Sequence, residues 1–392
     1  MLKEIFNIAN FYIFFWTAYY LLGALGLSGG FLTQSILLGL LLISIYNAFY
    51  AVTKYKLPIY FRGLNSLLLM FCIYGTYLIF SGEHLMIRAI YEPTPNYNYL
   101  KTIFISLLPI YSAYVYTRRR LLSTKTVKFW VVVWIIIASI AFFMNRLHEL
   151  SLSTSADEIT NNTAYSFIAI IPILILFYKS PLILFPSLLY CLVFILLGMK
   201  RGAILIAIIL LVYTIFNLYK LESARLKKYI VFFSIIVFCS LIAAVDYMLT
   251  NSDYFISRIE LTLEGNSSGR GDLYGLFISY FLNQQSLINI LFGNGANATL
   301  QIGPNYAHND WLELLINQGL LGIFIYLLYF YYFVKICCNS NVSKVPLLGL
   351  RLILITSFLA TIFSMSYMAL EIFTSVSLGF YMAMIDKAKS NY

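Results

Sequence analysis

Charged residues are scarce in this chain of 392 residues, where they make up 11% of the sequence while hydrophobic residues make up 61%. Soluble globular domains carry roughly 25% charged residues, so the composition excludes an ordinary soluble fold. It predicts an all-α polytopic membrane protein, with residues 1–392 forming a single integral membrane domain. Apolar stretches of about 20 residues, the length that crosses a bilayer, recur along the chain. We expect about twelve transmembrane helices, at about 5–22, 31–52, 64–80, 100–117, 129–144, 163–178, 181–198, 202–218, 229–247, 319–337, 346–366 and 368–385.

Cysteine is also rare, and several metal and nucleotide motifs are missing. The five cysteines fall within predicted spans or at a helix end, where a disulfide framework is not expected. The sequence contains no CxxC, HExxH or Asp-x-Asp pattern, and no GxxxxGK[ST] loop. These absences argue against a structural zinc site, a metal-holding aspartate pair and a nucleoside triphosphate loop. We therefore predict no metal and no cofactor, and expect the substrate itself to carry the energy for any reaction.

Lysine and arginine, although few, are distributed unevenly among the loops. If the N-terminus is cytoplasmic, 19 of the 26 basic residues fall in the termini and in the loops between helices that would face the cytoplasm. Since cytoplasmic loops retain basic residues, we expect both termini in the cytoplasm and the first helix to be an anchor instead of a cleaved signal peptide. The net charge of +10 then reflects membrane topology, and we predict no nucleic-acid partner.

The largest predicted external segment covers about 248–318, between the ninth and tenth helices. Apolar positions compatible with helices alternate there with Gly, Asn and Ser breaks. We expect short helices folded over the outer mouth of the bundle, with a tight turn at Gly293–Gly295.

Only three histidines occur in the chain, and one of them, His308, stands just before a predicted helix start. Asp310 followed three residues later by Glu313 has the spacing of a capping box. The positive end of a helix dipole favours a nearby anion and lowers the pKa of an imidazole, which keeps it neutral and able to accept a proton. The alternative is that His308 only hydrogen-bonds a loop carbonyl.

A second unusual feature is the pair Lys200 and Arg201, which separates two predicted spans on the outer side. Charge at membrane depth is costly, so this pair needs a counter-ion or an anionic ligand, unless both side chains reach water. Arg258 and Arg270 add two more external guanidiniums, and arginine suits bidentate phosphate recognition. A lipid-linked diphosphate at the membrane face would satisfy all four cations.

Four motifs in order, MKRGAIL, SGRGDLYG, LFGNGA and AHNDWLELLINQGLLG, resemble those of the O-antigen polymerase and O-antigen ligase superfamily. The motifs lie within about 198–322, and the rest of the chain agrees only in its predicted topology. The resemblance implies a multi-span glycosyltransferase of the bacterial cytoplasmic membrane that uses undecaprenyl-diphosphate-linked glycans. It also implies that Arg201 and Arg270 contact the donor diphosphate and that His308 lies at the acceptor. Lys200 and Arg258 are predicted to bind the diphosphate as well, and Asn309, Asp310 and Tyr274 are predicted to support the site.

This chemistry agrees with the residue types. Guanidiniums can stabilise a leaving diphosphate without a metal, and a neutral histidine can act as the general base for an acceptor hydroxyl. Asp246, Asp272 and Glu264 are rival bases.

The favoured function is polymerisation of lipid-linked oligosaccharide repeat units into O-antigen, capsular polysaccharide or another exopolysaccharide. The alternative is a ligase that transfers finished polymer to an acceptor, and a polysaccharide transporter or flippase is a more distant one. Membrane lipids, a chain-length regulator and a flippase are the other expected partners.

Overall fold

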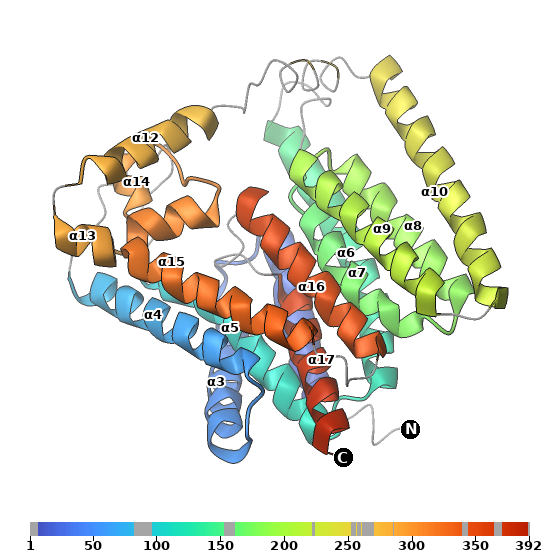
Figure 1. Ribbon diagram of the computed structural model, residues 1–392, viewed down its shortest axis with the longest axis horizontal. Coiled ribbons are helices and arrows are strands. Elements are labelled where there is room, and N and C mark those ends of the chain that lie inside the picture. The colour runs from blue at the N-terminus through green and yellow to red at the C-terminus, as the bar shows by residue number, and fades with distance from the viewer. Residues whose placement is uncertain are drawn as a thin grey trace.

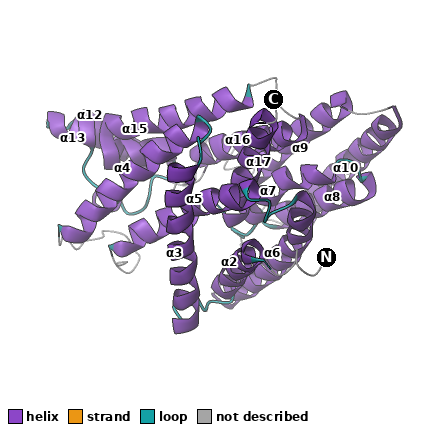
Figure 2. Cartoon of the chain, turned by 90° about the horizontal axis from the view of Figure 1, so that it is seen from below, coloured by secondary structure: helices purple, strands orange, loops and turns teal. Residues whose placement is uncertain are grey.

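A computed structural model of the chain describes residues 7–81, 96–152, 161–221, 224–251, 256, 260, 270–284, 286–338, 344–363 and 371–390. Within these ranges every regular element is a helix, as the composition predicts (Figures 1 and 2). The longer elements are α2 (Ile8–Ala24), α3 (Phe31–Lys54), α4 (Tyr60–Phe80), α5 (Tyr97–Arg118), α6 (Thr124–Leu152), α7 (Ala164–Leu174) with the 3-10 turn η2 (Ile175–Phe177), α8 (Pro181–Leu197), α9 (Arg201–Leu221), α10 (Ala224–Asn251), α12 (Arg270–Leu282), α15 (Asp310–Cys337), α16 (Lys344–Phe363) and α17 (Ile372–Ser390). Two short helices, α13 (Leu287–Phe292) and α14 (Thr299–Ile302), complete the described part.

Seven of the described helices are long and apolar enough to cross a membrane, namely α3, α4, α6, α9, α10, α15 and α16. Three shorter apolar helices are α2, α7 with its 3-10 turn, and α8. Each of the twelve predicted stretches overlaps a helix, but twelve crossings stay a prediction. Large apolar side chains on the helix surfaces are exposed, such as Phe31 (90%), Phe80 (83%) and Phe232 (64%). Such surfaces are stable against lipid and unfavourable in water.

The long helices form two groups joined by α16 and α17. Figure 1 shows α6 to α10 on one side and α3, α4, α5 and α15 on the other, with α16 and α17 between them. α17 packs closely along α5, because a Cβ on Gly379 would stand 2.1 Å from the carbonyl oxygen of Ile110. α4 approaches α15 equally closely, because a Cβ on Gly63 would stand 2.7 Å from the Cα of Tyr329. Small residues at contacts of this kind let membrane helices pack by close backbone approach.

Near its start, α15 is broken at Gly319, where φ is +66°. This conformation is one that glycine adopts at little cost, and it separates residues 310–318 from the stretch 319–337 that the sequence predicts to span the membrane. The turn predicted at Gly293–Gly295 packs against the break: the amides of Asn294 and Gly295 donate to the carbonyls of Ile316 and Asn317, each at 3.0 Å. Helices α12, α13 and α14 lie around the start of α15 (Figure 1), so the described part of the segment 248–318 contains several helices.

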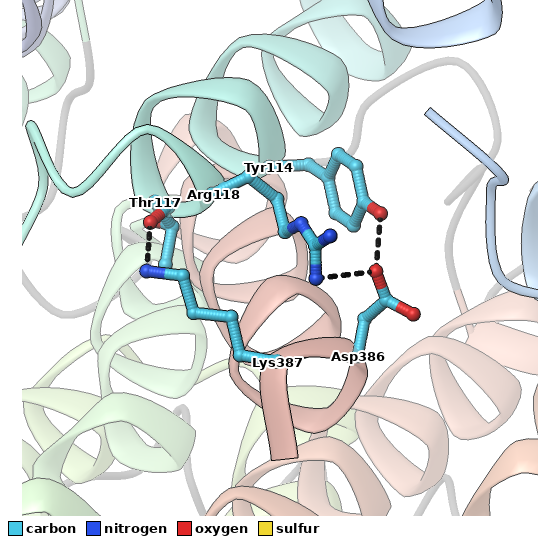
Figure 3. A network of polar contacts seen from close by, with 5 residues as sticks. All are labelled: Tyr114, Thr117, Arg118, Asp386 and Lys387. Atoms are coloured by element: carbon cyan, nitrogen blue, oxygen red, sulfur yellow. Dashed lines mark hydrogen bonds and ion pairs between the residues drawn. The ribbon is translucent and has the colours of Figure 1, made fainter. Parts of the chain in front are cut away.

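The far ends of α5 and α17 carry a separate polar network, which we call the Arg118 end (Figure 3). The Arg118 guanidinium pairs with a carboxylate oxygen of Asp386 at 2.9 Å. The Tyr114 hydroxyl donates to the same oxygen at 2.8 Å. Lys387 donates to the carbonyl of Thr117, which ties the last turns of the two helices together.

Candidate active site

The helix that follows His308 begins with a side-chain cap. Asn309 is extended, and its side-chain oxygen accepts from the amides of Trp311 at 3.0 Å and Leu312 at 3.3 Å. Asparagine is among the best N-cap residues because its side chain satisfies amides that the first turn leaves unpaired. The prediction that Asp310 caps this helix is therefore wrong by one residue, and Asn309 does so.

The predicted capping box is also wrong in the partner it assigns to Glu313. The buried Glu313 carboxylate accepts from the Thr299 hydroxyl at 2.6 Å, from the Asn317 amide at 3.2 Å and from the backbone N–H of Ala307. Thr299, Glu313 and Asn317 have no exposed surface. Glu313 thus fastens the loop between α14 and α15 to the first turn of α15, one residue before His308.

His308 itself has a left-handed backbone conformation, with φ at +52°. Residues other than glycine seldom adopt this conformation, and they do so where the surroundings enforce it. Here the fixed Ala307 on one side and the Asn309 cap on the other hold it in place. The side chain is half-buried. We call the region that contains His308, Arg270 and Lys200 the His308 end.

The electrostatic surroundings of His308 favour its neutral form. Burial lowers the pKa of His308 from its ordinary value, and the charges of Arg270 and Lys200 lower it further. A neutral imidazole at pH 7 can accept a proton. The structure therefore brings together three of the residues that the sequence singled out, from three separate elements.

Lys200 and Arg201 lie at the junction of α8 and α9. α8 ends at Leu197, Met199 has a φ of +49°, and Arg201 is the first residue of α9. Lys200 is half-buried and Arg201 is exposed. Lys200, which the sequence predicts to bind the diphosphate, is thus one of the two cations that act on His308.

Arg270 is the first residue of α12, and this helix is anchored through Phe277. Phe277 is completely buried and packs with Ala298, Ala307 and Ile316 in a small core of its own. This core connects α12 to the His308 loop and sets the position of Arg270. Tyr274 lies one turn further along α12 and is half-buried.

The other residues that the sequence predicts for the site are buried in the packing, exposed, or outside the described ranges. Asp310 is fully buried, and its carboxylate accepts from the Tyr326 hydroxyl at 2.7 Å, so it has a part in the packing of α15. Two of the rival bases, Asp246 on α10 and Asp272 on α12, are exposed. Arg258 and Glu264 lie outside the described residues.

Sequence reasoning missed Tyr165, in the first turn of α7. Its hydroxyl oxygen lies 3.1 Å from the position that a Cβ on Gly202 would take, and the charge of Arg270 reaches it. The surrounding segment is apolar and gives no sign of a site. The only available signal is that two polar residues, Tyr165 and Ser166, open an otherwise hydrophobic helix.

Within the described ranges no group of three or more His, Cys, Asp and Glu side chains is placed to hold a metal ion. Arg270 and Lys200, whose charges act on His308, are side chains of the kind that bind phosphate.

The membrane-length helices define a helical membrane protein, in which Lys200, Arg270 and His308 are brought together. Residues 186–327 match the O-antigen ligase family. The match includes Lys200, Arg201, Arg270 and His308, and it confirms the resemblance to the O-antigen polymerase and ligase superfamily. This family implies a membrane glycosyltransferase-like enzyme with lipid-linked glycans as substrates. No curated protein matches the chain.

Proposed function

We propose that the protein polymerises undecaprenyl-diphosphate-linked oligosaccharide repeat units at the outer face of the bacterial cytoplasmic membrane. The observation that carries this proposal is the half-buried His308, whose pKa is lowered by burial and by Arg270 and Lys200. A site of this kind offers a proton acceptor and an anion-binding pair side by side. These are the two functions that glycosyl transfer from a lipid diphosphate requires.

In the proposed reaction, the hydroxyl oxygen of the acceptor unit attacks the anomeric carbon of the donor glycan. The bond between that carbon and the diphosphate oxygen breaks, and the electron pair leaves with undecaprenyl diphosphate. The hydroxyl proton passes to a ring nitrogen of His308. Arg270, Lys200 and Arg201 stabilise the charge that grows on the diphosphate. The products are the lengthened glycan, free undecaprenyl diphosphate and a proton.

A ligase is the second candidate, and the name of the matched family supports it. Both reactions use the same donor chemistry and differ in the acceptor that approaches His308. A ligase acceptor is a lipid-anchored core oligosaccharide that carries phosphates, and it requires a strongly basic surface. The sequence predicts 7 basic and 13 acidic residues on the outer side, which favours a polymerase.

Deletion of the gene in its host separates the two functions. For a polymerase we expect single repeat units on the surface glycan or on the lipid carrier, with polymer restored by the wild-type gene. Full-length polymer that accumulates on the carrier and is missing from the final acceptor would identify a ligase instead.

The proposal also requires His308 to face outward and Arg118 to face the cytoplasm. Single cysteines in a cysteine-free background test this requirement. In intact cells, an impermeant maleimide should label Gln301→Cys, whose parent residue is exposed beside the His308 loop, and should spare Arg119→Cys. Labelling of position 119 would contradict the orientation.

A further inference from the structure

The first turns of α7 and α9 and the last turn of α16 meet at Gly202. A Cβ on this glycine would stand 2.9 Å from the Cβ of Phe363 and 3.1 Å from the hydroxyl oxygen of Tyr165. Distances this short require a neighbour to move. The absence of a side chain at position 202 therefore lets the Tyr165 hydroxyl lie against the backbone that follows Lys200 and Arg201.

The Tyr165 hydroxyl forms no hydrogen bond with any other described residue, although the tyrosine is half-buried. The hydroxyl oxygen is not among the fully buried polar atoms without a partner, so it keeps access to the surface, where a ligand can reach it. Its neighbour Ser166 behaves differently: the Ser166 hydroxyl lies 2.7 Å from the Tyr20 hydroxyl and 3.2 Å from a carboxylate oxygen of Glu371. Of the two polar residues that open α7, one is used inside the bundle and the other keeps a donor available for a ligand.

The charges around this hydroxyl indicate which ligand it would bind. Arg270 acts on Tyr165 as well as on His308, and Lys200 acts on His308 and lies two residues before Gly202. A donor placed among cations is suited to an oxygen that carries negative charge, since hydrogen bonds to ionised acceptors are stronger than neutral ones.

We propose that Tyr165 is a further donor-binding residue, whose hydroxyl donates a hydrogen bond to a phosphate oxygen of the lipid-linked diphosphate held by Arg270 and Lys200. This inference rests on the proposed function and adds a contact from α7 to those from α12 and the α8–α9 junction. Three donors from three separate elements define the orientation of a diphosphate, which one or two cations do not. Gly202 belongs to the same arrangement because it leaves the room that the phenol occupies.

The test uses the full-length protein in detergent, with farnesyl diphosphate as a probe for the lipid diphosphate. Tyr165→Phe keeps the ring and removes only the hydroxyl, so the fold is retained. We expect the Kd for farnesyl diphosphate to rise about tenfold or more, with a comparable fall in kcat/KM for a lipid-linked repeat unit. An unchanged Kd and kcat/KM, within about twofold of wild type, would overturn the inference.

Two further variants sharpen the result. Tyr178→Phe removes the matched hydroxyl at the other end of the same helical segment, and it should bind the probe as the wild type does. Gly202→Ala places a methyl group against both the Tyr165 hydroxyl and the Cβ of Phe363, so it should weaken binding more in the wild-type background than in Tyr165→Phe, where only the Phe363 contact remains. Independent, additive losses would contradict a shared role.

The experiment also separates this inference from the proposed function. A wild-type protein that polymerises lipid-linked units, with a Tyr165→Phe variant that is fully active, defeats the inference alone. Binding of the probe that depends on Tyr165, in a protein that transfers no glycan, defeats the proposed function alone.

Discussion

Basic side chains occur at both ends of the bundle, but they act on different groups there. At the Arg118 end the guanidinium is paired with Asp386 at 2.9 Å, and Tyr114 donates to the same carboxylate (Figure 3). At the His308 end, burial together with the charges of Arg270 and Lys200 lowers the pKa of the His308 imidazole. The first arrangement neutralises its charge within the protein. The second favours the neutral form of a histidine.

The difference shows why charge counts alone do not locate a site. The sequence contains many more basic residues on the predicted cytoplasmic side than on the outer side. Two residues of the smaller group, Arg270 and Lys200, nevertheless act on His308, within the segment that matches the O-antigen ligase family. Four experiments test this comparison.

The largest effect is expected for His308→Ala. Removing a general base reduces the rate by roughly 10² to 10⁴, so polymer should disappear from the surface glycan while the protein level stays near normal. His148→Ala, on α6, is the matched control and should be mild. Wild-type polymer lengths in His308→Ala would show that His308 is only a loop residue.

The next effect concerns the guanidiniums. Arg270→Lys and Arg201→Lys keep the charge but lose the fork that binds two phosphate oxygens together. We expect each to lower kcat by about 10² if the residue stabilises the leaving diphosphate. Arg118→Lys is the control at the opposite end. If both site variants behave as wild type, the donor binds elsewhere.

A smaller and more specific effect is expected for Lys200→Ala. Because Lys200 lowers the pKa of His308, the wild-type pKa lies below its ordinary value of 6.5, and activity is lost as the pH falls through it. Removing the positive charge raises this pKa, so the acid limb of the pH profile should move to higher pH. Lys179→Ala should leave the limb in place. A shift to lower pH, or none, would contradict the electrostatic coupling.

The smallest effect on activity is expected for Asp386→Asn, which breaks the network at the Arg118 end. Both side chains of the ion pair are about one-fifth exposed, at 20% and 21%. The variant should lower the free energy of unfolding by about 1 kcal/mol, measured by thermal unfolding in detergent, with polymer length unchanged. Loss of polymer at a normal protein level would give this end a part in the reaction.

Local features of the sequence predicted the helices well and their ends less well. The stretch around Phe232 is helical and apolar because hydrophobicity and helix propensity are properties of neighbouring residues. Asn309 and Asp310 are adjacent and equally able to cap a helix, so the sequence did not distinguish them. Asn309 caps because the loop enters with that residue extended.

The candidate site was predicted in part. Lys200, Arg270 and His308 were recognisable because cations and histidine are rare in an apolar chain, and because the motifs that carry them resemble a known superfamily. Tyr165 was not recognisable, because tyrosine is common in this sequence and residue 165 begins a helix that is otherwise buried and hydrophobic. The spacing of Glu313 from Asp310 predicted a capping box, which is the wrong set of partners. The sequence does not show the path of the loop that brings Thr299 and Ala307 to Glu313.

The sequence by itself determined that this is a membrane protein, that it is helical, and which types of side chain are available to the site. Each of these follows from composition and from short-range patterns, which depend only on residues that are near one another in the chain. Only the tertiary structure decided that residues 165, 200, 270 and 308 meet at one end of the bundle. That meeting depends on close packing between distant helices and on the small core around Phe277, where contacts join residues that are tens of positions apart.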